Sequence, residues 1–78
     1  MKNQLSTIRR TLEACQGQTV RLHVRGERNK ILDTRGVLEG LYGDVFTVYV
    51  QLEDYGRRYW YSYHDILTKN VSILPVNL

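Results

Sequence analysis

The stretch DVFTVYVQLEDYGRRYWYSYH, residues 44–64, decides the fold of this chain. Apolar and polar residues alternate through its first half, which is typical of a strand with one buried and one wet face. DYGR, residues 54–57, then indicates a turn in which Gly56 can take a positive φ. The second half is expected to return as an antiparallel strand, so the sequence predicts a β-hairpin whose strands share one apolar face.

The register of this hairpin places three tyrosines on the apolar face. A loop over residues 54–57 pairs Glu53 with Arg58, and the later pairs follow by counting. The pairs on the apolar side are then Leu52 with Tyr59, Val50 with Tyr61, and Val48 with Tyr63. We expect these rings to fill the core, with their hydroxyls at its rim, in preference to stacking on bases.

Trp60 is expected on the opposite, outward face, beside Tyr49. A tryptophan ring is unfavourable to leave in water. Either the N-terminal helix covers it, or an interface with a partner uses it, and the sequence leaves both alternatives open.

The segments before this hairpin predict one helix and two further strands. Four residues at helical spacing predict a helix over about residues 4–16: Leu5, Ile8, Leu12 and Cys15. Gly17 can end it in the left-handed conformation. The period then changes to two, with Val20, Leu22 and Val24 alternating with Arg21, His23 and Arg25. The return strand KILDTRGVLEGLY alternates poorly, so we expect a bulge or sharp bend near Gly36.

The end of the chain predicts one helical turn, capped by Asp65 and burying Ile66 and Leu67, and a last short strand that Pro75 ends. Five short strands around one small core close most naturally into a partly open barrel. The expected fold is therefore mainly β: a small SH3-like or Sm-like five-stranded barrel over about residues 18–76, preceded by an N-terminal α-helix. With 78 residues, the chain is expected to form a single domain, residues 1–78.

Composition argues against several classes of function. A chain of this length has no second lobe to close over a substrate, and no converging nucleophile, base and oxyanion donor is visible, so we expect no enzyme activity. One cysteine and two distant histidines, His23 and His64, give no metal-ligand spacing, and neither a metal nor a cofactor is expected. The sequence shows no signal peptide or membrane span, which favours a cytoplasmic location and no membrane partner.

The charge pattern leaves two kinds of partner open. The 11 basic residues outnumber the 8 acidic ones and give a net charge of +3, a mild excess that permits a nucleic acid or an acidic protein. Acidic residues near the same turns weaken the local field. The residues of the candidate partner or nucleic-acid surface are Arg21, His23, Arg25, Arg28, Lys30, Tyr49, Arg57, Arg58 and Trp60.

Several stretches are similar to one protein family. RGVLEGLYGDVFTVYV and YSYHDILT, together with the leading LSTIRRTLEACQGQTVRLHVRGERNK, resemble the Veg family, small cytoplasmic proteins of Gram-positive bacteria. The resemblance covers nearly the whole chain and implies an N-terminal helix before an SH3-like barrel. Gly43, where a proline is expected, and Trp60, where a small polar residue is expected, depart from that family's pattern. The resemblance supplies no binding residues.

The resemblance implies a non-enzymatic regulator, linked to stimulation of biofilm formation through control of matrix gene expression. We therefore expect a regulatory module that binds a protein, such as a transcription regulator. The alternative is a nucleic-acid-binding barrel that uses the basic hairpin and exposed aromatic residues. Open strand edges on so small a barrel also favour a homodimer.

Overall fold

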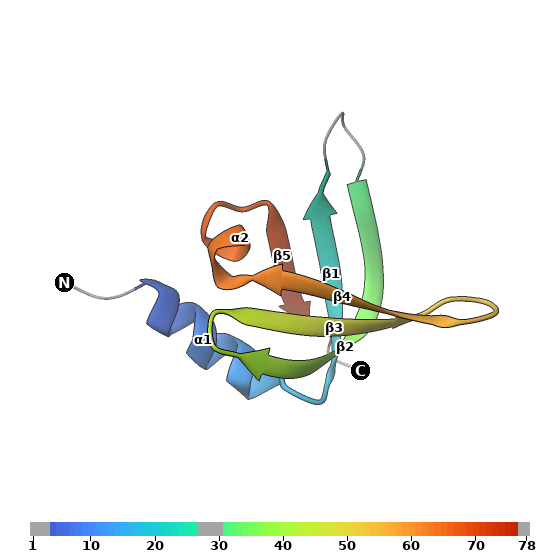
Figure 1. The fold of residues 1–78 in the computed structure, drawn as a ribbon, viewed down its shortest axis with the longest axis horizontal. Coiled ribbons are helices and arrows are strands. Elements are labelled where there is room, and N and C mark those ends of the chain that lie inside the picture. Colours follow the sequence, from blue (N-terminus) through green and yellow to red (C-terminus); the bar gives the residue numbers. More distant parts are fainter. Residues whose placement is uncertain (1–3, 27–30, 77–78) are drawn as a thin grey trace.

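Five strands and two helices follow one another in the part of the chain that the computed structural model describes, residues 4–26 and 31–76 (Figure 1). They are α1 (Gln4–Cys15), β1 (Thr19–Arg25), β2 (Ile31–Tyr42), β3 (Val45–Gln51), β4 (Gly56–Ser62), α2 (Tyr63–Leu67) and β5 (Val71–Pro75). Neighbouring strands are antiparallel, and their order in the sheet is β4-β3-β2-β1-β5. The predicted class is confirmed: the fold is mainly β, with five antiparallel strands in one sheet and an N-terminal α-helix, an arrangement consistent with a small barrel.

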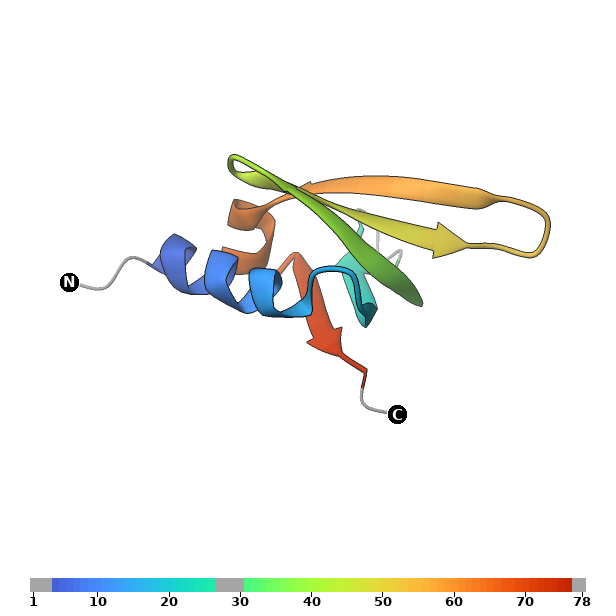
Figure 2. The ribbon, with the colours of Figure 1, turned by 90° about the horizontal axis from the view of Figure 1, so that it is seen from below.

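The inner face of the sheet and one side of α1 form the core. Its buried apolar side chains are Leu12, Cys15, Val20, Leu22, Leu38, Phe46, Val48, Val50, Tyr63 and Val71. Figure 2 shows α1 lying beside α2, below the hairpin of β3 and β4. Gly17, with φ of +83°, follows the end of α1 in the left-handed conformation, as predicted.

β2 is long because it pairs with two neighbouring strands in succession. Its first half pairs with β1 and its second half with β3, and Figure 1 shows the strand changing direction between them. Gly36 pairs regularly with Val20, so the bulge predicted near Gly36 lies further along the strand. The pairing shifts between Leu38 and Leu41, where the Gly40 amide donates to the Thr47 hydroxyl at 3.0 Å. A side-chain acceptor thus replaces a regular ladder bond at this point.

The predicted register of the hairpin of β3 and β4 is wrong by four residues. Its loop spans residues 52–55, where the Leu52 amide donates to the Tyr55 carbonyl at 2.7 Å, and Gly56 already belongs to β4. Gly56 has no positive φ. The residue is a glycine for another reason: the Tyr49 ring lies where a Cβ on Gly56 would be.

The error leaves the two faces unchanged, because a shift by an even number keeps every side chain on its side of the sheet. Tyr59 lies opposite Val48 and Tyr61 opposite Phe46, both on the inner face as predicted. Tyr63 is buried as predicted, but it begins α2 instead of pairing with Val48.

The helical turn after β4 is confirmed as α2, but its predicted cap is wrong, because Asp65 lies at the third position inside the helix. Ser62 is the N-cap, and its hydroxyl accepts a hydrogen bond from the Asp65 amide at 3.2 Å. The Asp65 carboxylate accepts from the Ser62 amide at 3.0 Å, which completes a capping box. This reciprocal cap ends β4 at Ser62 and turns the chain beneath the sheet.

Candidate partner-binding surface

Trp60 and Tyr42 form a stacked pair on the outer face of the sheet. Their ring centroids are 5.6 Å apart, and the planes meet at 29°. Trp60 is 60% exposed, so the N-terminal helix does not cover it, and this alternative from the sequence is excluded. Thr47, opposite Trp60 in the ladder, is buried on the same face, and the Tyr42 ring lies across Gly40. The two rings therefore rest on the small residues of β2 and β3.

Arg58 extends this outer face next to Trp60. Its Nε lies 2.7 Å from Glu39 Oε1, and its guanidinium lies 5.9 Å from the centroid of the Tyr49 ring. The hydrogen bond to Glu39 raises the pKa of Arg58, so the side chain stays charged. The Tyr49 hydroxyl in turn donates to Gln51 Oε1 at 3.2 Å. We name the set Trp60, Tyr42, Thr47, Arg58 and Tyr49 the outer aromatic face.

A second stack runs along the inner side of β4. The Arg57 guanidinium lies 5.2 Å from the centroid of the Tyr59 ring. Tyr59 and Tyr61 are nearly parallel, with centroids 6.2 Å apart and planes at 6°. Burial raises the pKa of Tyr61, so its hydroxyl stays protonated at neutral pH. We name Arg57, Tyr59 and Tyr61 the inner stack.

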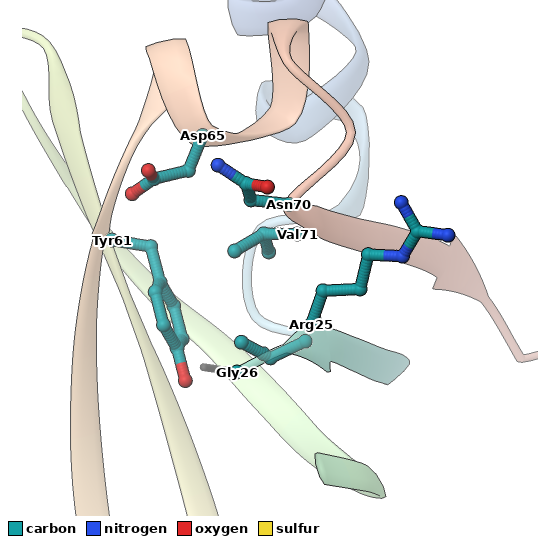
Figure 3. A pocket seen from close by; sticks show the side chains of 7 residues that line it. Arg25, Gly26, Tyr61, Asp65, Asn70 and Val71 are labelled. Atoms are coloured by element: carbon teal, nitrogen blue, oxygen red, sulfur yellow. The ribbon is translucent and has the colours of Figure 1, made fainter. Parts of the chain in front are cut away.

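An open pocket of about 440 Å³ lies beside β4 (Figure 3). Its lining comes from the ends of β1 and β4, from α2 and from the start of β5: Val24, Arg25, Gly26, Tyr61, Asp65, Asn70 and Val71. In Figure 3 the Tyr61 ring forms one side, Asp65 and Asn70 lie at one end, and the Arg25 guanidinium points away from Tyr61. The pocket therefore has an apolar floor and a polar rim.

Among the basic residues predicted on the first hairpin, Arg21 forms an ion pair where the structure describes it. Arg21 Nε and Nη2 each lie 3.0 Å from an oxygen of Asp33, and His23 Nδ1 lies 3.7 Å from the same carboxylate. Arg25 is exposed, and no described acidic residue pairs with it. Arg28 and Lys30 lie outside the described residues. In the sheet, β2 and β3 lie between β1 and β4, but Arg25 at the end of β1 and Tyr61 of β4 line the same pocket.

Sequence reasoning missed two residues of this surface. Tyr42 was not expected beside Trp60, and its position follows from its pairing with Val45 after the shift in β2. Asp33 was not expected to contact Arg21, because this bidentate contact depends on the register between β1 and β2. In both cases the missing signal was strand register.

The ion pair on β1 and β2 predicts a titration that can be measured. The hydrogen bond from Arg21 lowers the pKa of the Asp33 carboxyl below its ordinary value of 3.8. Because the folded pKa is depressed, the pair contributes stability above the ordinary value and loses it as the pH falls through the folded pKa. NMR titration of Arg21→Ala should show the pKa of Asp33 rising. An unchanged pKa would contradict the contact, and Arg35→Ala serves as a control on the same face.

No group of three or more His, Cys, Asp or Glu residues in residues 4–26 and 31–76 could hold a metal ion. Within the same ranges, no helix is both long and apolar enough to cross a membrane.

Comparison with known proteins identifies one family. The family model described as biofilm formation stimulator VEG matches residues 3–74, which is nearly the whole chain. A search of curated proteins found no match. The matched range takes in α1, the first four strands and all but the last residue of β5, so the agreement is not confined to one motif. The chain therefore belongs to the family of the biofilm formation stimulator VEG.

Proposed function

We propose that this chain is a non-enzymatic cytoplasmic module that influences biofilm-related gene expression by binding a protein partner, such as a transcription regulator. The family supports the biofilm-related role. The observation that carries the binding mode is the exposed Trp60 ring, held in place by Tyr42. A tryptophan fixed before binding loses little conformational freedom on association, and Trp, Tyr and Arg are the residues that dominate binding energy at interfaces.

The chemistry of the outer aromatic face favours recognition over catalysis. The Thr47 and Tyr49 hydroxyls and the Arg58 guanidinium already have partners: Thr47 accepts from the Gly40 amide, Tyr49 donates to Gln51, and Arg58 contacts Glu39. Catalysis would need a nucleophile, a base and a stabilising donor that converge on one reacting atom. The aromatic rings instead offer apolar area, with a polar rim around it, as binding hot spots do.

A nucleic acid is the second candidate, and the inner stack favours it. Successive bases could stack on Tyr59 and Tyr61, with Arg57 beside them. The acidic partners of Arg21 and Arg58 reduce the charge available for phosphates, which is why we rank it second. Titration with single-stranded and duplex oligonucleotides, followed by Trp60 fluorescence at two salt concentrations, tests this candidate. Oligonucleotide binding that persists at physiological salt would make a nucleic acid the favoured partner.

Replacement of Trp60 by alanine should separate binding from folding. We expect a loss of stability of about 1 kcal/mol, since one exposed ring pair is lost, and a loss of partner affinity of about 30-fold or more. Partner capture from cell extract, calorimetry on the captured protein and biofilm mass of a strain with the substitution would measure these effects.

Tyr55→Ala is the matched control for this experiment. Tyr55 is 59% exposed, close to the 60% of Trp60, but it lies in the loop between β3 and β4. Removing it should leave both capture and biofilm mass unchanged. Equal effects of the two substitutions, or full capture by Trp60→Ala, would contradict the proposed surface.

A further inference from the structure

The hydrogen-bond pattern of the hairpin shows which backbone groups of β4 are unused. The Tyr63 amide donates to the Asp44 carbonyl at 2.9 Å, and the Leu52 amide donates to the Tyr55 carbonyl at 2.7 Å. Both pairs continue the register of β3 with β4. Hydrogen-bonded and non-hydrogen-bonded pairs alternate in an antiparallel ladder, so positions 57, 59 and 61 bond to β3.

Arg58 and Trp60 therefore direct their N–H and C=O groups to the opposite edge of β4. Ser62 agrees with this pattern, since its amide points away from β3 and donates to the Asp65 carboxylate. β4 is an edge strand of the sheet, and no described strand pairs with its outer side. Edge strands of this kind commonly carry a proline, a bulge or a cover that blocks pairing. β4 has regular pairing over seven residues and contains no proline.

Large side chains line this edge on both sides. Trp60 and Arg58 project to the outer aromatic face, and Tyr61 of the inner stack lines the pocket shown in Figure 3. A strand added to β4 would place alternate side chains on these two faces. Those on the outer side would lie against Trp60, and those on the inner side would lie against Tyr61 and enter the pocket.

We propose that the free edge of β4 binds an extended, acidic segment of the partner protein as an added strand. The inference rests on the proposed function and specifies the class of segment that is recognised. Backbone bonds to Arg58 and Trp60 would supply affinity, and the two lined faces would supply selectivity.

Charge complementarity indicates that the segment is acidic. Arg57 on β4 and Arg25 on the rim of the pocket are exposed, and no described carboxylate pairs with either of them, whereas Glu39 already compensates the charge of Arg58. The edge offers both donors and acceptors, which match a peptide backbone. A phosphodiester backbone supplies acceptors alone, and so it would leave the outward carbonyl groups unpaired.

The edge also makes pairing with the β4 strand of a second copy unfavourable. That arrangement would bring two copies of Arg57 and two of Arg58 into one small interface, and like charges in neighbouring strands are destabilising. A partner segment with acidic residues would instead compensate them.

Amide hydrogen exchange measured by NMR tests the added strand directly. The probes are linear peptides of about twelve residues, selected on the folded protein from a random display library. We expect acidic sequences without central prolines, and a slowing of exchange at the Arg58 and Trp60 amides of about tenfold or more on binding. The Tyr59 and Tyr61 amides should be protected with or without peptide.

Two substitutions at position 58 separate the contribution of the backbone amide to peptide binding from that of the side chain. Arg58→Ala keeps the outward amide, and Arg58→Pro removes it without removing a bond to β3. The selected peptides should bind Arg58→Pro about tenfold more weakly than Arg58→Ala. If Arg58→Pro fails to fold, the exchange measurement on the unsubstituted protein still shows whether the peptide binds to β4 as an added strand.

Three results would overturn the proposal. The first is selection of no peptide, or only of proline-rich or basic peptides. The second is protection of Arg58 and Trp60 that rises with protein concentration alone, which would indicate a second copy. The third is binding of a twelve-residue oligothymidylate that protects these amides better than any peptide.

If Trp60→Ala abolishes partner capture while the two amides stay unprotected in the complex, the proposed function stands and the added strand is wrong.

Discussion

Replacing Gly36 with valine is expected to leave the protein largely unfolded at room temperature. Gly36 is buried where β2 passes from β1 to β3. A Cβ at this position would lie 2.7 Å from the Tyr49 carbonyl oxygen and 2.7 Å from Val48 Cγ1. The carbonyl belongs to the backbone of β3, so it cannot move without disturbing the ladder. The larger side chain of valine adds further overlap.

The expected loss approaches the lower end of the stability of a domain of this size. Native proteins are stable by about 0.05–0.15 kcal/mol per residue, and overpacking against a backbone reaches about 3 kcal/mol or more. Circular dichroism and the dispersion of amide signals in NMR would report the loss of structure.

Gly43→Ala is the control for this experiment. Gly43 has φ of +60° but open space around its Cβ position. The alanine should therefore cost only about 1 kcal/mol of backbone strain. A Gly36→Val protein with a melting temperature near that of the unsubstituted chain would show that β2 does not need this close approach.

The faces of the strands could be predicted from sequence because alternation depends on neighbouring residues alone. Val20 and Leu22 are buried, and Trp60 points outward, as their positions in the pattern indicated. The loop of the second hairpin could not be placed in the same way. Gly56 looked like a turn residue, but the Tyr49 ring occupies the space beside it, and that contact exists only once the strands are paired.

In the candidate surface, too, the direction of side chains could be predicted from sequence, whereas contacts between strands could not. The outward direction of Trp60 followed from alternation, whereas its contact with Tyr42 depends on the shift in β2 between Leu38 and Leu41. The basic residues were visible in the sequence, but the ion pair of Arg21 with Asp33 requires the register of β1 with β2. Contacts between side chains on different strands determine whether a charged residue forms an ion pair. Such contacts could not be predicted from the alternation of neighbouring residues.

Phe46→Ala should destabilise the protein by about 3–5 kcal/mol, the range for removing a fully buried aromatic ring. Phe46 is 0% exposed, and its ring centroid lies 6.0 Å from that of Tyr61 and 6.1 Å from that of Tyr63. Alanine leaves a cavity between these rings and β3. The rigid sheet cannot close that cavity, because the ladder fixes the spacing of the strands.

Urea unfolding followed by the fluorescence of Trp60, the only tryptophan, measures this loss. Phe46→Leu retains most of the volume and should lose markedly less stability, while Tyr55→Ala, at an exposed position, should stay within about 0.5 kcal/mol of the unsubstituted chain.

The Tyr63 hydroxyl is buried, and no described residue bonds to it. Ring packing alone therefore holds the Tyr63 side chain in place, so Tyr63→Phe should be tolerated where Phe46→Ala is not. Equal losses for those two substitutions would show that the hydroxyl, and not the packing against Phe46, holds α2 on the barrel.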